Sequence, residues 1–199
     1  MQPIRHINDI EPLDDGAVDA HCSVALQPYL FDHPSGIDNP VSTYALLDAA
    51  KVPNLREMIE SSGLENRCIF SGHTFDELAD VAPWLVRLEP GHLFVRRLFE
   101  KGDAPWELWN RDAGIFLRSS LSIDDLRRHL KKFTKASDGS GQNYFVRFWE
   151  PSWTLPLLNT MAAEQAHKFL APLHSVCCHT GTEAILLAGG AHTAEYRQS

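Results

Sequence analysis

The hydrophobic pattern of the chain changes near residue 41. From there on, short apolar runs alternate with amphipathic segments, as strands and helices do when they follow one another. Strands are expected at the short, β-favouring runs 41–47, 67–70, 84–88, 114–118 and 143–149. A further apolar run near the end of the chain, residues 184–188, is a candidate for a last strand.

The best-defined helix is expected directly after Ser122. The serine can cap the first turn, and Asp124 and Asp125 follow where the helix dipole favours negative charge. One face of this helix is basic, with Arg127, Arg128, Lys131, Lys132 and Lys135. This face is either simply solvated or a contact for an acidic partner or for the chain's own acidic N-terminal segment.

Other helices are placed by their start and stop signals. Pro53 suits the first turn of a helix and Gly63 suits its end. Thr74 is expected to cap a short helix as the first residue of a capping box. A long helix is expected over 151–170, with a kink or a fresh start at Pro156.

Repeated alternation of strands and helices predicts an α/β fold. We expect a Rossmann-like domain over residues 41–190, with a mainly parallel five-stranded sheet and helices on both faces. Strand 143–149 carries large side chains on both faces, so both faces should be covered.

Acidic residues are concentrated at the start of the chain. The net charge is −8, and residues 1–40 hold seven acidic residues against one arginine. We interpret this segment as an acidic N-terminal extension that docks on the domain or stays mobile. The acidic balance also argues against nucleic-acid binding, which needs a basic footprint.

Export and membrane signals are missing from the sequence. The N-terminus has no basic start followed by an apolar run, and no apolar stretch approaches the ~20 residues that a membrane span needs. The four cysteines, Cys22, Cys68, Cys177 and Cys178, form no CxxC pair. We therefore expect a cytoplasmic protein with reduced thiols and no membrane partner.

The motifs of common catalytic and cofactor sites are also missing. Neither GxGxxG nor GxxxxGK[ST] is present, so the expected fold does not imply a nucleotide. GxSxG is absent too, although Ser71 follows a strand and precedes His73, which leaves a small α/β hydrolase as an alternative. The cluster of His174, Cys177, Cys178 and His179 is a poor zinc site, because strand alternation would separate its ligands.

Two arginines stand out because each lies on an expected inner strand. Arg118 and Arg147 need partners if they are buried, and a guanidinium can hold a carboxylate with two hydrogen bonds. They are either structural ion pairs or part of a polar patch at one end of the sheet. We name Arg118 and Arg147, with Trp149 and Glu150, as candidate partner-binding residues.

Six short blocks occur in a characteristic order along the chain. They are YALLDAA at 44–50, IFSG at 69–72, APWLVRL at 82–88, GIFLRSS at 114–120, LRRHL at 126–130 and FVRFWEP at 145–151. Over about residues 43–173 this series resembles the adaptor and chaperone family of bacterial type VI secretion systems, the Tap or TEC chaperones.

The resemblance implies a role rather than a reaction. Such adaptors hold a toxic effector in the cytoplasm and help load it onto the VgrG spike, without catalysis and without a cofactor. The chain departs from the family pattern at Ser152 and Trp153, where a basic residue commonly follows the proline. A helical C-terminal lobe is expected to be absent or much shortened. A toxin-binding regulatory module without spike contact is the other alternative.

Overall fold

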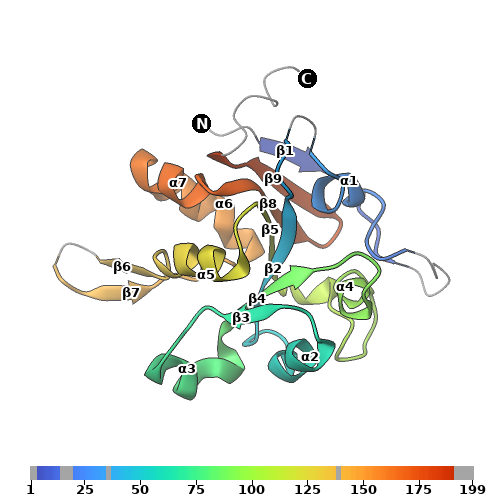
Figure 1. The fold of residues 1–199 in the computed structure, drawn as a ribbon, viewed down its shortest axis with the longest axis horizontal. Helices are drawn as coiled ribbons and strands as arrows, with labels where there is room; N and C mark the ends of the chain where they lie inside the picture. The colour runs from blue at the N-terminus through green and yellow to red at the C-terminus, as the bar shows by residue number, and fades with distance from the viewer. Residues whose placement is uncertain (1–3, 14–19, 35–36, 138–139, 191–199) are drawn as a thin grey trace.

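A seven-stranded sheet forms the centre of the protein. The computed structural model describes residues 4–13, 20–34, 37–137 and 140–190. The strand order is β1-β9-β8-β5-β2-β4-β3, and Figure 1 shows helices on both sides of the sheet, with α5, α6 and α7 on one side and α1 and α4 on the other. The strands of this sheet are β1 (Ile4–Ile7), β2 (Ser42–Asp48), β3 (Asn66–Cys68), β4 (Pro83–Leu88), β5 (Gly114–Ser119), β8 (Leu173–Thr180) and β9 (Glu183–Ala188).

The helices follow the apolar stripes of the sequence. They are α1 (Gln27–Leu30), α2 (Leu55–Ser62), α3 (His73–Leu78), α4 (Leu93–Arg97), α5 (Ile123–Lys131), α6 (Pro151–Thr160) and α7 (Ala163–Leu170), with the 3-10 turns η1 (Ala79–Val81) and η2 (Trp109–Arg111). Within the described residues, no helix is long and apolar enough to cross a membrane.

The expected parallel, five-stranded Rossmann-like sheet is wrong. Every pair of neighbouring strands among the described residues is antiparallel. β2 and β3 do run in the same direction, and so do β4 and β5, but an antiparallel strand lies between the members of each pair. A helix between two strands lets the second strand run in the same direction as the first, but it does not make the two strands neighbours. The alternation of strands and helices therefore did not reveal that β4 lies between β2 and β3, or that β2 lies between β4 and β5.

The run 143–149 is not a central strand. Only β7 (Asn143–Phe145) is extended, and it pairs with β6 (Lys135–Ser137) in a separate two-stranded sheet. The chain then turns towards α6, and its aromatic side chains Phe148 and Trp149 are each 1% exposed. The bulky residues therefore reflect burial against the main domain rather than membership of its sheet.

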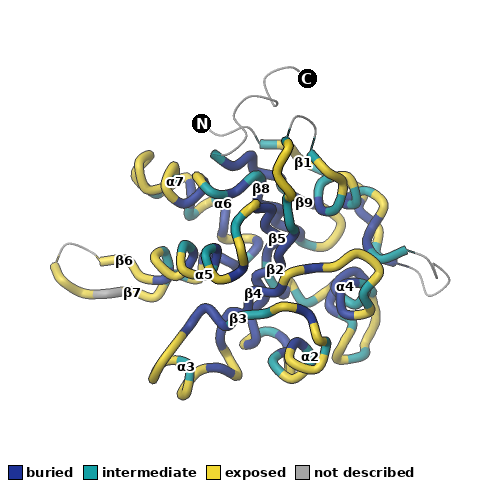
Figure 2. Tube along the Cα trace, viewed as in Figure 1, coloured by how far each residue is buried: buried dark blue, intermediate teal, exposed yellow. Residues whose placement is uncertain are grey.

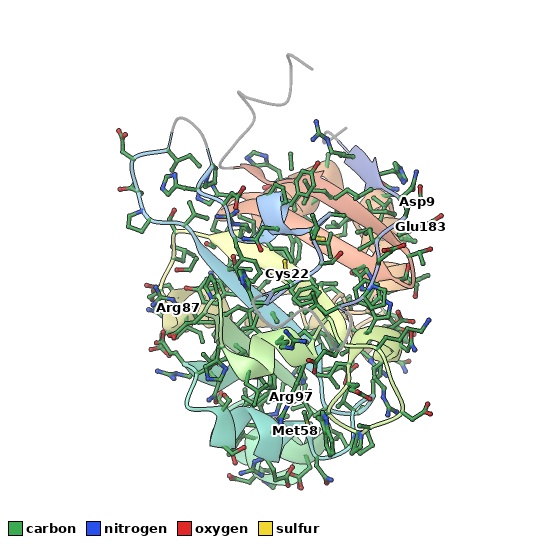
Figure 3. All side chains as sticks on the ribbon, turned by 90° about the vertical axis from the view of Figure 1, so that its right-hand side faces the viewer. Asp9, Cys22, Met58, Arg87, Arg97 and Glu183 are labelled. Carbon is green, nitrogen blue, oxygen red and sulfur yellow. The ribbon has the colours of Figure 1, made fainter. Side chains whose placement is uncertain are left out.

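The described parts of the acidic N-terminal segment pack against the domain. β1 pairs with β9, and the side chains of Ile10, Leu26 and Leu30 are fully buried. Figure 3 shows Asp9 beside Glu183 at this edge of the sheet, where the backbone N–H of Ile10 donates to the carbonyl of Thr182 at 2.9 Å. Apolar residues spaced three or four apart thus let an acidic segment contribute to the core.

Helix boundaries show which local signals were decisive. Ser122 caps α5, its hydroxyl accepting from the N–H of Asp125 at 3.2 Å, and Gly63 ends α2 in a left-handed conformation, as expected. Thr74 is not a cap, because α3 begins one residue earlier after Gly72. Residues 151–170 form two helices that separate after Thr160, while Pro156 lies inside α6.

The core follows the main sheet. Figure 2 shows buried chain along β2, β4, β5 and β8, with exposed chain on the outer helices and on the β6–β7 hairpin. β5 approaches β2 closely at its first residue: a Cβ on Gly114 would lie 1.9 Å from the carbonyl oxygen of Leu46. Only glycine fits there without displacing the backbone.

Candidate functional site

The last residue of β2, Asp48, is a buried carboxylate at the end of the main sheet. Its side chain is 2% exposed. Oδ2 accepts hydrogen bonds from a guanidinium nitrogen of Arg147 and from the indole Nε1 of Trp149, the latter at 3.0 Å. Oδ1 accepts from the backbone N–H of Ala50 at 3.0 Å. The carboxylate is thus held by three donors, which compensates for removing its charge from water.

A second ion pair joins the same two regions of the chain. Lys51 Nζ lies 3.2 Å from Glu150 Oε1, and both side chains are partly exposed. Glu150 is the residue before the first turn of α6, where the hydroxyl of Thr154 donates to the carbonyls of Phe148 and Glu150 at 2.7 and 2.9 Å. The loop after β2 and the segment before α6 therefore form one rigid unit, although they are 99 residues apart in sequence.

Exposed apolar side chains surround this unit. Leu78 is 42% exposed, Val81 53% and Phe145 50%. With Arg147 and the buried Asp48 and Trp149, they line a pocket of about 220 Å³. We call these six residues the Asp48 patch.

An aromatic series connects the patch to the core. The ring centroid of Phe145 lies 5.2 Å from that of Phe70 and 5.9 Å from that of Trp149, in edge-to-face geometry. Trp149 in turn contacts Phe148, and Phe148 contacts Phe169. Because these rings hold one another, Phe145 is exposed and yet fixed in position, which lowers the entropy lost when a partner covers it.

Arg118 lies far from the other three candidate residues. It pairs with Thr43, which is five residues before Asp48 on β2, so the two positions are about 17 Å apart along the strand. An odd separation also places them on opposite faces of the sheet. The contacts agree: Tyr44, on the Asp48 face, donates to the carbonyl of Leu121 before α5, whereas Thr43 donates to the carbonyl of Leu30 in α1.

The structure thus brings Arg147, Trp149 and Glu150 together and places Arg118 elsewhere. Arg118 is 4% exposed, and its Nη1 donates to the backbone carbonyls of Tyr29 at 3.2 Å and Asp32 at 2.7 Å. It fastens the N-terminal segment to the sheet. Arg147, by contrast, is 43% exposed at the rim of a pocket.

Sequence reasoning missed Asp48 and Lys51 as the partners in this site. One signal was available for Asp48, since a carboxylate that ends a buried apolar strand needs donors nearby. Its donors lie about a hundred residues away in sequence, so local patterns did not identify them. The apolar rim of Leu78 and Val81 had no signal, because isolated exposed apolar residues are common on proteins.

The other chemical candidates have simpler environments. Among the described residues, no group of three or more metal-ligating side chains is placed to hold an ion. On β8, Cys178 faces one side of the sheet while Cys177 and His179 face the other. Burial raises the pKa of the Cys178 thiol to about 12, so it stays protonated at neutral pH.

Comparison with known proteins identifies a family for most of this region. Residues 43–168 match the family model described as a domain of unknown function, DUF4123. The matched segment contains β2 to β7 and nearly all of α7, and thus the whole Asp48 patch. Searches of curated proteins and of solved structures found no match to this chain.

Proposed function

The chain belongs to the DUF4123 family, and on that premise we propose that it is a cytoplasmic adaptor of a bacterial type VI secretion system. It binds a toxic effector protein and helps load it onto the VgrG spike. The proposal is supported by the six sequence blocks that resemble type VI adaptors over about residues 43–173, nearly the same stretch that the family model matches.

The observation that carries a binding role is the composition of the Asp48 patch. Its rim combines exposed apolar side chains with an arginine whose guanidinium is anchored on one side by a buried carboxylate. Anchored arginines and aromatic residues are the groups that most often dominate protein–protein interfaces. The exposed side of Arg147 can pair with a partner carboxylate while Phe145 and Val81 pack against apolar groups.

We propose that the chain has no catalytic activity. The Ser71 hydroxyl, the nucleophile of the hydrolase alternative, accepts a hydrogen bond from Lys131 on α5. The ring of His73 is 85% exposed and lies 3.3 Å from Glu77 in the same helix. A nucleophilic serine needs a histidine base within hydrogen-bond reach, and these partners argue for a structural role of both residues instead.

Affinity purification of the tagged full chain from its native host tests the proposal. The bound proteins are identified by mass spectrometry at low and moderate salt. We expect both a large toxin-like protein and a VgrG spike protein. Recovery of the toxin without the spike, in cells that express both, would instead support a toxin-binding regulatory module. Recovery of neither from cells that produce both would reject the adaptor role.

A further inference from the structure

A second surface lies on the other side of the β6–β7 hairpin from the Asp48 patch. It is a groove of about 1110 Å³ between the end of α5 with the hairpin and the two helices α6 and α7. Consecutive residues at the end of β7 and directly after it face the two sites, since Phe145 and Arg147 line the patch pocket while Val146 lines the groove. The groove exceeds the ~300–1,000 Å³ of small-molecule sites, so its size suits a peptide segment.

The rim of the groove is basic in a chain whose net charge is −8. Lys132, Lys135 and Lys168 line it, and none of its lining residues is acidic. Lys168 pairs with Glu164 in the same helix, whereas Lys132 and Lys135 make no ion pair within the described ranges. We call this surface the basic groove.

Lys132 and Lys135 differ from the other cations of the basic α5 face. Arg127 donates to the carbonyls of Cys68 and Phe70, and Arg128 pairs with Asp125. Those cations are used in holding α5 to the rest of the fold or in stabilising its own turns. Lys132 and Lys135, which follow α5, are exposed at the groove. An acidic ligand would give both of them an ion-pair partner.

The floor of the basic groove is apolar. Phe133, Val146, Leu157 and Met161 are all half-buried there. His129 adds no charge at neutral pH, because burial lowers its pKa and outweighs the opposite effect of the hydrogen bond from its Nε2 to the carbonyl of Phe169. A matching ligand therefore carries apolar side chains on one face and acidic side chains beside them.

The chain's own acidic segment is not placed to fill the basic groove. Residues 4–13 and 20–34 of this segment pack at the β9 edge and on the Arg118 face of the sheet, and residues 37–40 lead into β2. The groove is formed by α5, α6 and α7, which lie on the opposite side (Figure 1). The described part of this segment therefore does not supply the complementary charge, and an acidic partner protein can.

We propose that the basic groove binds an acidic amphipathic segment of a partner protein. The binding mode is a helix laid in a groove, with its apolar face on Phe133 and Met161 and its carboxylates beside Lys132 and Lys135. The inference goes beyond the proposed function, because it assigns a second docking surface that is separate from the Asp48 patch.

A designed peptide tests the chemistry directly. The probe is a fluorescein-labelled helix of about 18 residues, or five turns, with leucines on one face and glutamates on the other. A scrambled peptide of the same composition and a version with lysine in place of glutamate are the peptide controls. Fluorescence anisotropy measures binding to the full chain at about 0.05 and 0.3 M salt.

The groove variant is the double change Lys132→Glu with Lys135→Glu, and the control is Lys101→Glu, at an exposed lysine outside the groove. We expect the acidic amphipathic peptide to bind most tightly, and Lys132→Glu with Lys135→Glu to weaken binding about tenfold or more, since attraction becomes repulsion at two positions. Lys101→Glu should leave this affinity unchanged. The proposal would be overturned if the groove variant and Lys101→Glu bound the acidic peptide with equal affinity. It would also be overturned if the unaltered chain bound the lysine peptide as tightly as the acidic one.

Cross-linking maps the site on the unaltered chain. A photoreactive group on the peptide's apolar face should label residues 129–137 and 157–172, and labelling confined to other regions would contradict the proposal. A chain shortened to residue 190 should bind the peptide with the same affinity. A many-fold gain in affinity would mean that residues 191–199 occupy the groove, and the assignment to a partner would then fail.

Discussion

Two arginines have different roles in this protein: Arg118 lies on β5 of the main sheet, and Arg147 packs from outside the sheet against Asp48 on the opposite face. Arg118 is 4% exposed and donates to two backbone carbonyls of the N-terminal segment. Arg147 is 43% exposed and pairs with a buried carboxylate at the edge of an open pocket. Arg118 joins the N-terminal segment to the main sheet, whereas Arg147 presents part of its guanidinium to solvent.

The difference shows what distinguishes a structural arginine from a binding arginine. Both lie in runs that the sequence pattern assigned to strands, so position along the chain does not separate them. Burial and the identity of the acceptor do separate them: backbone carbonyls surround Arg118, whereas Arg147 combines a carboxylate with an exposed apolar rim. The predictions below test whether the two faces can be separated by mutation.

The largest loss of stability is expected at Trp149, beneath Arg147. Trp149→Ala removes a side chain that is 1% exposed, and should lower the free energy of unfolding by about 3–5 kcal/mol. Trp149→Phe keeps an aromatic ring but loses the N–H to Asp48 and part of the buried indole, so a smaller loss of about 1–3 kcal/mol is expected. Urea unfolding measures both. A loss below about 1 kcal/mol in the alanine variant would mean that the patch is not supported by the core.

Removal of Arg118 should be the next largest effect. Arg118→Ala leaves the carbonyls of Tyr29 and Asp32 without this donor and should cost about 2–4 kcal/mol. The loss should be accompanied by faster hydrogen exchange in residues 20–34, measured by mass spectrometry. Arg118→Lys keeps the charge and should retain part of the stability. Unchanged hydrogen exchange in residues 20–34 would argue against the role of Arg118 in holding this segment against the sheet.

Acid should destabilise the protein through His179, which lies on the Arg118 face. Burial lowers its pKa below the ordinary 6.5, so the unfolded chain takes up a proton first as the pH falls. Stability should therefore decrease below about pH 6.5 and level off below the folded pKa. The slope is at most about 1.4 kcal/mol per pH unit for each such histidine.

The control for this pH effect is His179→Gln. Thermal unfolding between pH 7.5 and 5 should show a shallower decrease for the variant than for the unaltered chain. His129, whose pKa burial also lowers, contributes the same sign from the opposite face, so the double variant should be shallower still. An identical decrease in all three proteins would exclude these histidines as the cause.

The smallest effect on stability is expected at the rim of the Asp48 patch. Val81→Ser and Val24→Ser change valines that are 53% and 84% exposed, and each should alter the free energy of unfolding by no more than about 0.5 kcal/mol. Only Val81→Ser should reduce the amount of effector recovered in the affinity purification, by about fivefold or more. Val24 lies on the N-terminal segment, outside the Asp48 patch, so its replacement should leave the recovery unchanged. Equal capture by both variants would remove the patch from the binding surface.

Many local elements of this fold could be predicted from the sequence, although β1 and β8 were not, and the arrangement of the elements could not. The stripe after Ser122 and the apolar runs of β2, β4 and β5 carry their own signals. Strand direction depends on which strands become neighbours, and no local pattern in β4 indicates that it inserts between β2 and β3. The run 143–149 was misleading because Phe148 and Trp149 are buried in a turn rather than in a strand.

The candidate site shows the same division. Arg147, Trp149 and Glu150 could be proposed because an arginine and a tryptophan in one apolar block need partners and often serve binding. Their actual partners, Asp48 and Lys51, required knowledge of which distant segments meet. Arg118 was included on the assumption of a shared sheet end, which the antiparallel pairing of β2 and β5 does not support.

The pairing of β1 with β9 has a consequence for synthesis on the ribosome. Ile4 pairs with Leu187, so the first strand must wait for about 183 residues to be made before its partner exists. At about 5–20 residues per second this delay lasts about 10–40 seconds. During that time Ile4, Ile7 and Ile10 remain without their final neighbours. The charged residues interspersed with these isoleucines, Arg5, Asp9 and Glu11, then serve a second purpose: they keep the nascent segment soluble until the last strand emerges.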